Sequence, residues 1–251
     1  MNKLSIIILT HNEQHNIADC IQSANFADEI LVIDDNSDDQ TVNIAKQNGA
    51  KVISHALNND FAAQRNFALS SATHDWVLFL DADERITPPL AEEIKQIVQN
   101  NQKIAYQIRR LNHFQKKRVR FGTLKADFVT RLFPKNGVQY VGQVHESPQH
   151  AYPTQKCTAS MLHYTYETWG QYFNKLNRYA ELSAQRYLQQ GKKVSFFKDI
   201  VLRPLWAFWR VYFFNLGFLD GKIGYLLAMN HYFYTLQKYQ RYYYSRQTSK
   251  E

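Results

Sequence analysis

Four short apolar segments in the first hundred residues each end beside a cluster of polar side chains. The segments are rich in Ile, Val and Leu, as strands buried in a parallel sheet are, and they cover residues 4–9, 29–33, 51–54 and 76–80. Helix-forming segments follow each of them, at residues 16–24, 41–48, 61–72 and 88–98. This alternation predicts an α/β domain with a doubly wound sheet.

The polar clusters mark the carboxyl ends of three of these predicted strands. Thr10 to Glu13 follow the first strand, Asp34 and Asp35 end the second, and Asp81-Ala82-Asp83 ends the fourth. In open α/β sheets this edge is where ligands bind. We therefore expect a ligand site formed by these clusters.

Asp81 and Asp83 have the spacing of a cation site. Two carboxylates at a strand end can share a hard cation such as Mg²⁺ or Mn²⁺, which would neutralise a diphosphate and help it leave. The alternative is a solvated turn or a cap on the next helix. From the spacing alone, Asp81 and Asp83 would share the cation; His145 could also ligate it, orient an acceptor or cap a turn.

Two further groups fit a nucleotide. An acidic residue at the end of the second strand, Asp34 or Asp35, can accept bonds from a base or a ribose, or else cap the following helix. Arg65 can pair with a phosphate, or else form a surface ion pair. The chain has neither a G-x-G-x-x-G after the first strand nor a Walker-A lysine, which excludes a dinucleotide dehydrogenase site and a P-loop.

The chain changes character after residue 103. Strands are predicted at residues 105–110 and 127–133, around a basic loop, and at 138–144, followed by a helix at 169–190. Glu146 follows the last of these strands. A carboxylate there can act as the general base toward an acceptor hydroxyl, or it is a charged strand end without a role.

The two ends of the chain differ in their charge and in their content of aromatic residues. Residues 1–100 carry 6 Lys/Arg against 15 Asp/Glu, and residues 192–251 carry 10 against 3. Residues 196–244 combine Phe, Trp and Tyr with basic side chains, and their longest uncharged stretch, 223–237, is shorter than the roughly 18 residues of a membrane span. We expect a helical region that lies on a membrane surface, with packing on the catalytic domain as the alternative.

The two cysteines and the first apolar segment indicate the cellular compartment of the protein. The two cysteines, Cys20 and Cys157, form neither a disulfide framework nor a metal motif, which favours the reducing cytoplasm. Residues 4–9 are too short an apolar run for a signal peptide, and polar residues follow directly.

Four blocks of the sequence, in order, resemble the family 2 inverting glycosyltransferases, which have a GT-A fold. The blocks are residues 4–13, 32–41, 64–66 and 78–84. Within that family the chain is similar to the lipopolysaccharide core glucosyltransferases that add β-1,4-glucose to the first inner-core heptose. That similarity rests on residues 131–133, 142–146 and 217–224.

The resemblance implies a role for each matching residue. Leu9, Thr10 and Glu13 would line the nucleotide pocket, Asp35 would meet the base with Asp34 beside it, and Arg65 would lie near the nucleotide. Asp81 would contact the ribose or sugar, Arg131 would join the substrate-binding residues, Asp83 would bind Mg²⁺ or Mn²⁺, and Glu146 would be the catalytic base. The chain lacks the Q-x-x-R-W element of many members, which argues against a processive synthase.

The resemblance also implies partners and a location. The donor would be UDP-glucose and the acceptor a lipid-linked core oligosaccharide, with the enzyme on the anionic inner face of the inner membrane. We expect a GT-A domain over residues 1–190, with the donor site in 1–100 and the acceptor side in 101–190, and a helical extension over 191–251.

Three alternatives remain open. One is a nucleotidyltransferase acting on a sugar phosphate, although such enzymes normally have a Gly-rich loop after the first strand. Another is a glycosyltransferase that builds a different cell-envelope glycan. The third is a nucleic-acid-binding module, suggested by basic segments with interleaved aromatics. The acidic first hundred residues argue against the third alternative, and we expect no nucleic acid partner.

Overall fold

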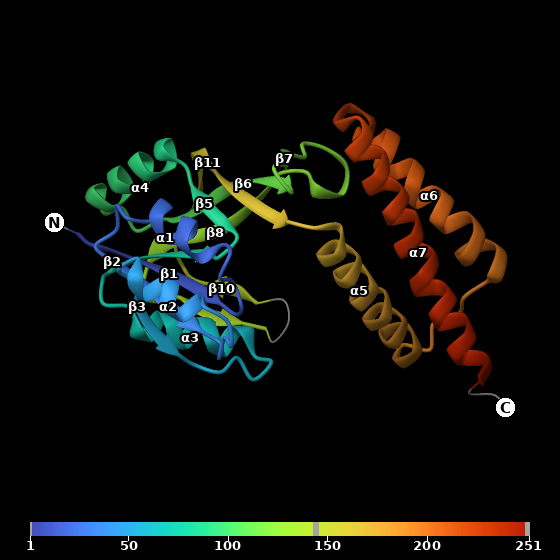
Figure 1. Ribbon diagram of the computed structural model, residues 1–251, viewed down its shortest axis with the longest axis horizontal. Coiled ribbons are helices and arrows are strands. Elements are labelled where there is room, and N and C mark those ends of the chain that lie inside the picture. The colour runs from blue at the N-terminus through green and yellow to red at the C-terminus, as the bar shows by residue number, and fades with distance from the viewer. Residues whose placement is uncertain (1, 143–145, 249–251) are drawn as a thin grey trace. The chain divides into compact units, whose positions relative to one another are not determined.

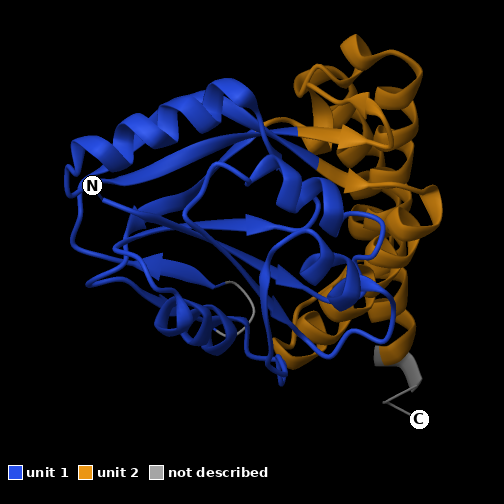
Figure 2. Ribbon diagram, turned by 60° about the vertical axis from the view of Figure 1, so that its left-hand side comes forward, with its two compact units in different colours: residues 1–111, 127–163 blue, residues 112–126, 164–251 orange. Residues whose placement is uncertain are grey.

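The computed structural model describes residues 2–142 and 146–248. The chain divides into two compact units (Figure 2). Unit 1 comprises residues 1–111 and 127–163, and unit 2 comprises residues 112–126 and 164–251. The division falls within two long strands, β6 (Ala105–Phe114) and β11 (Thr154–Tyr166).

Parallel strands make up the first half of the unit 1 sheet. Their order is β3 (Lys51–Ser54), β2 (Glu29–Asp34), β1 (Leu4–Thr10) and β4 (Trp76–Asp81). The register sets Leu9 beside Asp81 and Thr10 beside Asp34. The predicted polar clusters therefore do lie at one edge of the sheet.

Antiparallel strands complete the sheet. β8 (Asp127–Pro134) pairs with β4, and β6 follows β8; then come β11 and the short β5 (Glu84–Ile86). A two-residue strand, β7 (Lys117–Arg118), pairs with β6, while β9 (Gln139–Val141) and β10 (Ser147–Gln149) form a separate hairpin. Of the strand predicted at 138–144, the structure describes residues 138–142, and β9 covers three of them. The strands β5, β7, β10 and β11 were not predicted.

Helices cover both faces of this mixed sheet (Figure 1). Side chains of α1 (Ile17–Ser23), α2 (Thr41–Gln47) and α4 (Pro88–Asn100) share a core with Ile6 and Ile8 of β1. Those of α3 (Phe61–Ser71) share the opposite core with Ile7. Alternate residues of one strand thus enter different cores, because successive side chains of a strand point to opposite faces. The predicted α/β fold with a doubly wound mixed sheet is confirmed.

Unit 2 is mainly helical. It contains α5 (Trp169–Gln189), α6 (Arg203–Trp209) and α7 (Lys222–Thr248), with π-helical turns at Phe196–Leu202 and Arg210–Phe214 and a short 3₁₀ turn at Gly217–Asp220. Both α5 and α6 pack on α7. The unit boundary therefore differs from the predicted one at residue 190, because α5 packs with the C-terminal helices. No helix in the described residues is long and apolar enough to cross a bilayer.

Candidate active site

A buried ion pair joins the end of β4 to the neighbouring strand β8. Arg131 donates to both carboxylate oxygens of Asp81, with 3.3 Å between Nη1 and Oδ1. Burial alone would raise the pKa of Asp81, but the charges of Arg131 and Arg65 outweigh that effect and hold it well below its usual range. Asp81 is therefore ionised at neutral pH, and both of its oxygens are occupied by arginine.

Glu84 extends this pair into a network. It begins β5, three residues after Asp81, and one of its carboxylate oxygens accepts the Asp81 backbone N–H at 2.9 Å. The other oxygen lies 3.1 Å from Arg131 Nη2 and 3.5 Å from Arg110 Nη1. The Glu84 side chain is fully buried, and burial raises its pKa despite the nearby charge of Arg131.

Arg65 connects Asp81 to Glu146. Its Nε lies 3.1 Å from Glu146 Oε1 and its Nη2 lies 3.4 Å from Asp81 Oδ1. The guanidinium stands over the rings of Phe79 and Tyr140, at 5.1 and 5.4 Å from their centroids. Arg65 and Glu146 therefore lie in direct contact at this site. The Glu146 side chain is 18% exposed.

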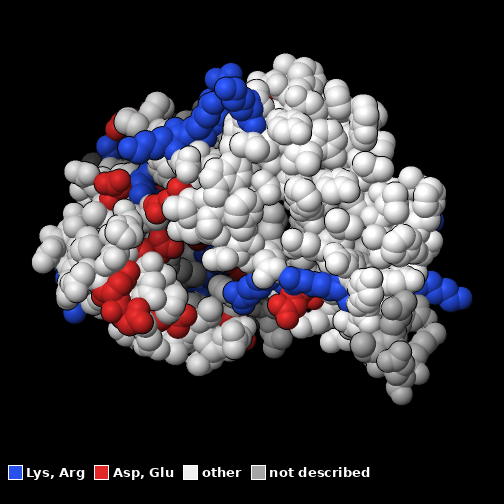
Figure 3. Space-filling view, turned by 45° about the vertical axis from the view of Figure 1, so that its right-hand side comes forward, with Lys and Arg blue, Asp and Glu red and all other residues white. Residues whose placement is uncertain are grey.

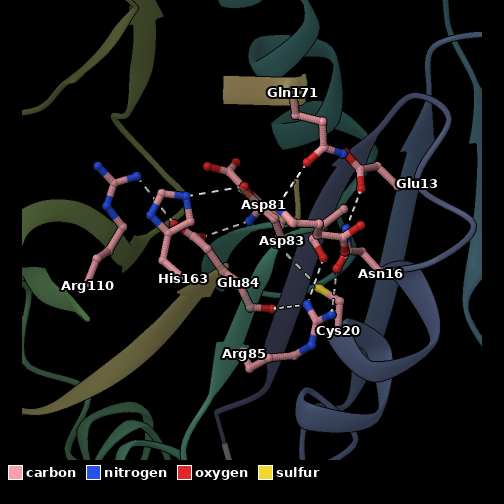
Figure 4. A network of polar contacts seen from close by, with 12 residues as sticks. Glu13, Asn16, Cys20, Asp81, Asp83, Glu84, Arg85, Arg110, His163 and Gln171 are labelled. Carbon is pink, nitrogen blue, oxygen red and sulfur yellow. Dashed lines mark hydrogen bonds and ion pairs between the residues drawn. The ribbon is translucent and has the colours of Figure 1, made fainter. Parts of the chain in front are cut away.

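Asp83 has a partner that sequence reasoning missed. His163, on β11, places Nε2 3.2 Å from Asp83 Oδ2 (Figure 4). The pairing of β11 with β5 fixes this contact, because it sets His163 opposite Glu84. Carboxylate oxygen is the ligand type that Mn²⁺ and Mg²⁺ prefer, and imidazole nitrogen is a ligand of transition metals. The Asp83 and His163 side chains are partly exposed, at 30% and 13%. These two residues fit a cation whose other ligands come from a diphosphate or water.

The described residues alone do not complete a metal site. They contain no group of three His, Cys, Asp or Glu side chains placed to hold an ion. His145, the other proposed ligand, lies outside the described residues. Asp81 is engaged by arginines, so Asp83 and His163 are the stronger candidates.

Asp34 and Asp35 have different surroundings. Asp34 is 1% exposed, and its two oxygens accept from the backbone and hydroxyl of Ser37, so it closes a turn. The Thr41 N–H at the start of the following helix is bound by another residue, Asp39, whose Oδ1 accepts it at 2.8 Å. The Asp35 carboxylate accepts the Leu57 N–H at 2.8 Å and is 26% exposed. Asp35 is thus the member of the pair within reach of a ligand.

The end of β1 supplies the remaining predicted residues. Leu9 is partly buried beside Asp81 in the sheet register. Glu13 accepts from the Asn16 side chain at 3.0 Å, and its backbone N–H donates to the Thr41 hydroxyl at 2.8 Å. The Thr10 hydroxyl is buried at the same edge.

Three buried polar atoms of this edge lack a hydrogen-bond partner. Across the described part of the chain, the buried side-chain atoms in this state are Thr10 Oγ1, Arg65 Nη1 and Arg131 Nε. Buried polar groups are normally paired, so each such atom needs an explanation. All three belong to residues predicted from the sequence as a substrate site, and two of them are cationic donors suited to phosphate oxygens.

Comparisons with known proteins identify the family. The model described as glycosyl transferase family 2 matches residues 5–167. An uncharacterized glycosyltransferase of Rickettsia prowazekii, RP128, is 32% identical over 243 residues, which cover 90% of this chain and 82% of that protein. The chain belongs to glycosyl transferase family 2. The predicted family and enzyme class are confirmed.

This glycosyltransferase is also similar to more fully described proteins. The lipopolysaccharide core biosynthesis glycosyltransferase LpsC of Rhizobium meliloti is 27% identical over 239 residues, covering 90% of this chain and 86% of LpsC. The structure of S. aureus TarS residues 1–349 is 15% identical, with a TM-score of 0.48 over 95% of this chain and 91% of that one.

A further solved structure is glucosyl-3-phosphoglycerate synthase of Mycobacterium tuberculosis, in complex with Mn²⁺, UDP and glucosyl-3-phosphoglycerate. It is 21% identical to this glycosyltransferase with a TM-score of 0.37, and the match covers 46% of this chain and 45% of that one. The matched segment is therefore less than half of either chain.

Proposed function

We propose that this enzyme transfers glucose from UDP-glucose to a heptose of a lipid-linked core oligosaccharide, with inversion at the anomeric carbon. The observation that carries the donor site is the set of unpaired buried atoms on Thr10, Arg65 and Arg131 at the carboxyl edge of the sheet. The 27% identity to a lipopolysaccharide core enzyme supports the acceptor class.

The donor would bind at the ends of β1, β2 and β4. Leu9, Thr10 and Glu13 line one side, and the Asp35 carboxylate is available for the base. Arg65 Nη1 and Arg131 Nε are available for polar atoms of the donor. Asp81 holds both arginines in place through its carboxylate. Within unit 1, residues 1–100 would thus bind the donor and the later strands would face the acceptor.

Asp83 and His163 would hold Mg²⁺ or Mn²⁺ with the diphosphate. When bound, such an ion stabilises the negative charge that develops on the leaving diphosphate. Their separation of 3.2 Å supports this assignment, since two ligands of one ion must lie close together.

Glu146 would act as the general base. It takes the proton of the acceptor hydroxyl as that oxygen forms its bond to the anomeric carbon; the bond to the diphosphate oxygen breaks, and UDP leaves with the electron pair. Arg65 Nε orients the carboxylate through the contact at 3.1 Å.

Unit 2 would hold the enzyme at the inner face of the inner membrane. Residues 192–248 contain two acidic residues, Asp199 and Asp220, and both are engaged internally. Asp199 pairs with Arg203, and Asp220 accepts the backbone N–H groups of Arg120 and Phe121. The charge left for an outside partner is positive, as an anionic membrane surface requires.

Exposed aromatic side chains in residues 196–219 support the same assignment. Seven of them are at least 41% exposed: Phe196, Phe197, Trp206, Trp209, Phe213, Phe214 and Phe218. The rings of Trp209 and Phe213 stack 4.5 Å apart, and Trp206 contacts Phe214 at 5.4 Å. The helical part of unit 2 turned to the viewer in Figure 3 is largely uncharged. Large exposed apolar patches of this kind mark interaction surfaces.

The donor is tested by a thermal-shift screen of nucleoside diphosphates and nucleotide-sugars, with and without Mn²⁺. We expect the largest metal-dependent stabilisation with UDP and UDP-glucose, because ligands that bind the native state raise its melting temperature. A larger shift with a guanosine or adenosine diphosphate would contradict the donor assignment.

The acceptor is tested by following labelled glucose into purified core oligosaccharide lipid that ends at the inner-core heptose. We expect transfer to this lipid and none to the same lipid already glucosylated at that heptose. Transfer to both lipids at the same rate would contradict the proposed acceptor site.

A further inference from the structure

Three basic side chains of unit 2 surround one buried tyrosine. The charged groups of Lys192, Arg203 and Lys238 lie 5.6, 5.4 and 5.3 Å from the ring centroid of Tyr239, which is 2% exposed. They come from three different segments: the chain after α5, the start of α6, and α7. The fold therefore gathers charges that the sequence keeps apart.

Hydrogen bonds fix the positions of this cation–tyrosine cluster. Arg203 Nη1 donates to the Tyr239 hydroxyl at 3.1 Å, and that hydroxyl in turn donates to Tyr187. Lys192 Nζ stands 3.8 Å from the Tyr187 ring centroid, and its backbone carbonyl accepts from Tyr242. Contacts with tyrosines of α5 and α7 thus fix the positions of Arg203 and Lys192.

The cluster carries more positive than negative charge. Its paired carboxylate in the described part of the chain is Asp199, which bonds to Arg203. Aromatic faces stabilise cations but do not neutralise them. Burial and the neighbouring cations Lys192 and Arg203 lower the pKa of Lys238. Although burial raises the pKa of Tyr187, its bond from Tyr239 and the charges of Lys238 and Lys192 lower it overall. The cation–tyrosine cluster therefore favours the binding of an anionic group.

The cluster continues into the exposed aromatic surface. Arg203, 44% exposed, lies one turn before Trp206, and Phe196 contacts the ring of Tyr243 at 5.8 Å. Trp206 and Phe196 are themselves 56% and 55% exposed. A ligand that satisfies both features has an anionic head beside an apolar body, which is the chemistry of a phospholipid.

We propose that the cation–tyrosine cluster of Lys192, Arg203 and Lys238 is a binding site for the phosphate headgroup of a membrane lipid. The inference rests on the proposed membrane contact of unit 2 and specifies where one lipid would be held. Lys192 and Lys238 contribute point charges to the phosphate oxygens, and Arg203, anchored by Asp199, supplies directed N–H donors. Tails of the lipid would lie against the exposed aromatic side chains.

The test measures binding of the full chain to three kinds of vesicle: phosphatidylcholine alone, with phosphatidic acid, and with oleate at the same surface charge. Oleate is anionic without phosphate, so it separates a headgroup site from general attraction. The wild-type protein should prefer phosphatidic acid over oleate. Lys192→Gln/Lys238→Gln should weaken binding to phosphatidic acid about 25-fold, since each lysine near an anionic surface contributes roughly fivefold, and it should abolish the preference for phosphatidic acid over oleate.

The matched control is Lys193→Gln/Lys222→Gln, which removes the same charge from two exposed positions. It should lower binding to both anionic vesicles alike and leave the preference for phosphatidic acid intact. Retention of the preference for phosphatidic acid in both double variants, or its loss in both, would overturn the site. A further arm adds inorganic phosphate at the same concentration as the lipid headgroup. If the preference for phosphatidic acid is then lost, the cluster binds free phosphate, and the proposal of a lipid headgroup site is overturned.

Two further measurements distinguish the headgroup site from the aromatic membrane contact and from the proposed catalytic function. Trp206→Ala/Trp209→Ala should weaken binding to all three vesicles while retaining the preference for phosphatidic acid. Mn²⁺-dependent UDP binding, measured on every variant, should stay unchanged and reports separately on the proposed catalytic function. If the wild-type protein binds UDP but shows no preference among anionic vesicles, the headgroup site is wrong and the transferase assignment stands.

Discussion

His163 Nε2 lies 3.2 Å from Asp83 Oδ2, although Asp83 follows a parallel strand and His163 lies on an antiparallel one. Asp83→Ala and His163→Ala should therefore each lower glucose transfer about 100-fold, because a catalytic cation contributes several kcal/mol to the transition state. Calorimetry should show that Mn²⁺ no longer strengthens UDP binding in either variant. His74→Ala, outside the site, serves as the control. Full Mn²⁺ dependence in His163→Ala would exclude His163 as a ligand.

Glu146→Gln removes the proposed base while preserving the shape of the side chain. We expect kcat to fall by about 10²–10⁴ with little change in the affinity for UDP-glucose, since the carboxylate acts on the acceptor. Steady-state kinetics and equilibrium donor binding give the two quantities. Glu92→Gln, on the exposed face of α4, is the matched control. A kcat within a few-fold of wild type would assign the base to another residue.

Arg131→Met should destabilise the protein by about 3–5 kcal/mol, because it removes the buried cation that the Asp81 and Glu84 carboxylates share, and the remaining contacts of Arg65 and Arg110 are longer. Urea unfolding measures this free energy. Lys95→Met breaks the exposed pair with Glu92 and should cost less than about 1 kcal/mol. Similar losses in both variants would show that the buried network is no more important than a surface pair.

His231 predicts a pH dependence of unit 2. Burial first, and then the charges of Arg210 and Lys238, lower its pKa from 6.5 to about 4. Between these values the unfolded chain binds the proton and the folded chain does not, so stability should fall as pH falls from about 6.5 to about 4, by at most about 1.4 kcal/mol per pH unit.

The pH dependence is measured by urea unfolding of the wild-type protein and of His231→Gln across this range. The variant should lose this part of the dependence. The Arg210 guanidinium, 3.4 Å from His231 Nε2, and the ring of Tyr234 also face the imidazole and remain in both proteins. Parallel pH profiles for the two proteins would contradict the assignment.

The gathering of polar side chains at one edge of the sheet was predictable from the sequence, because parallel strands bring their carboxyl ends to the same edge. The register sets Leu9 beside Asp81, and the Asp35 N–H donates to the Thr10 carbonyl at 2.9 Å, as strand order alone would lead one to expect. Arg65 and Arg131 were predicted as substrate residues, but their joint pairing with Asp81 depends on which strands become neighbours.

The missed features depend on tertiary pairing. The segment of β11 mixes polar and apolar residues without strict alternation, so no periodicity marks it as a strand of 13 residues. His163 becomes a partner of Asp83 through the register of β11 on β5, which no local signal predicts. Asp34 likewise closes a turn with Ser37, a role that its position at a strand end does not reveal. In unit 2, α5 joins the C-terminal helices because its side chains pack on α7.

The shared charges of Asp81, Glu84 and Arg131 restrict how this site can change during evolution. Each arginine serves more than one carboxylate, so replacing any single member leaves an uncompensated charge in a buried place. We therefore expect selection against variants that carry a single substitution at one of these positions. Family members that have lost one of these charges should differ at a second member of the network as well, whereas exposed pairs such as Glu92 and Lys95 are free to vary independently.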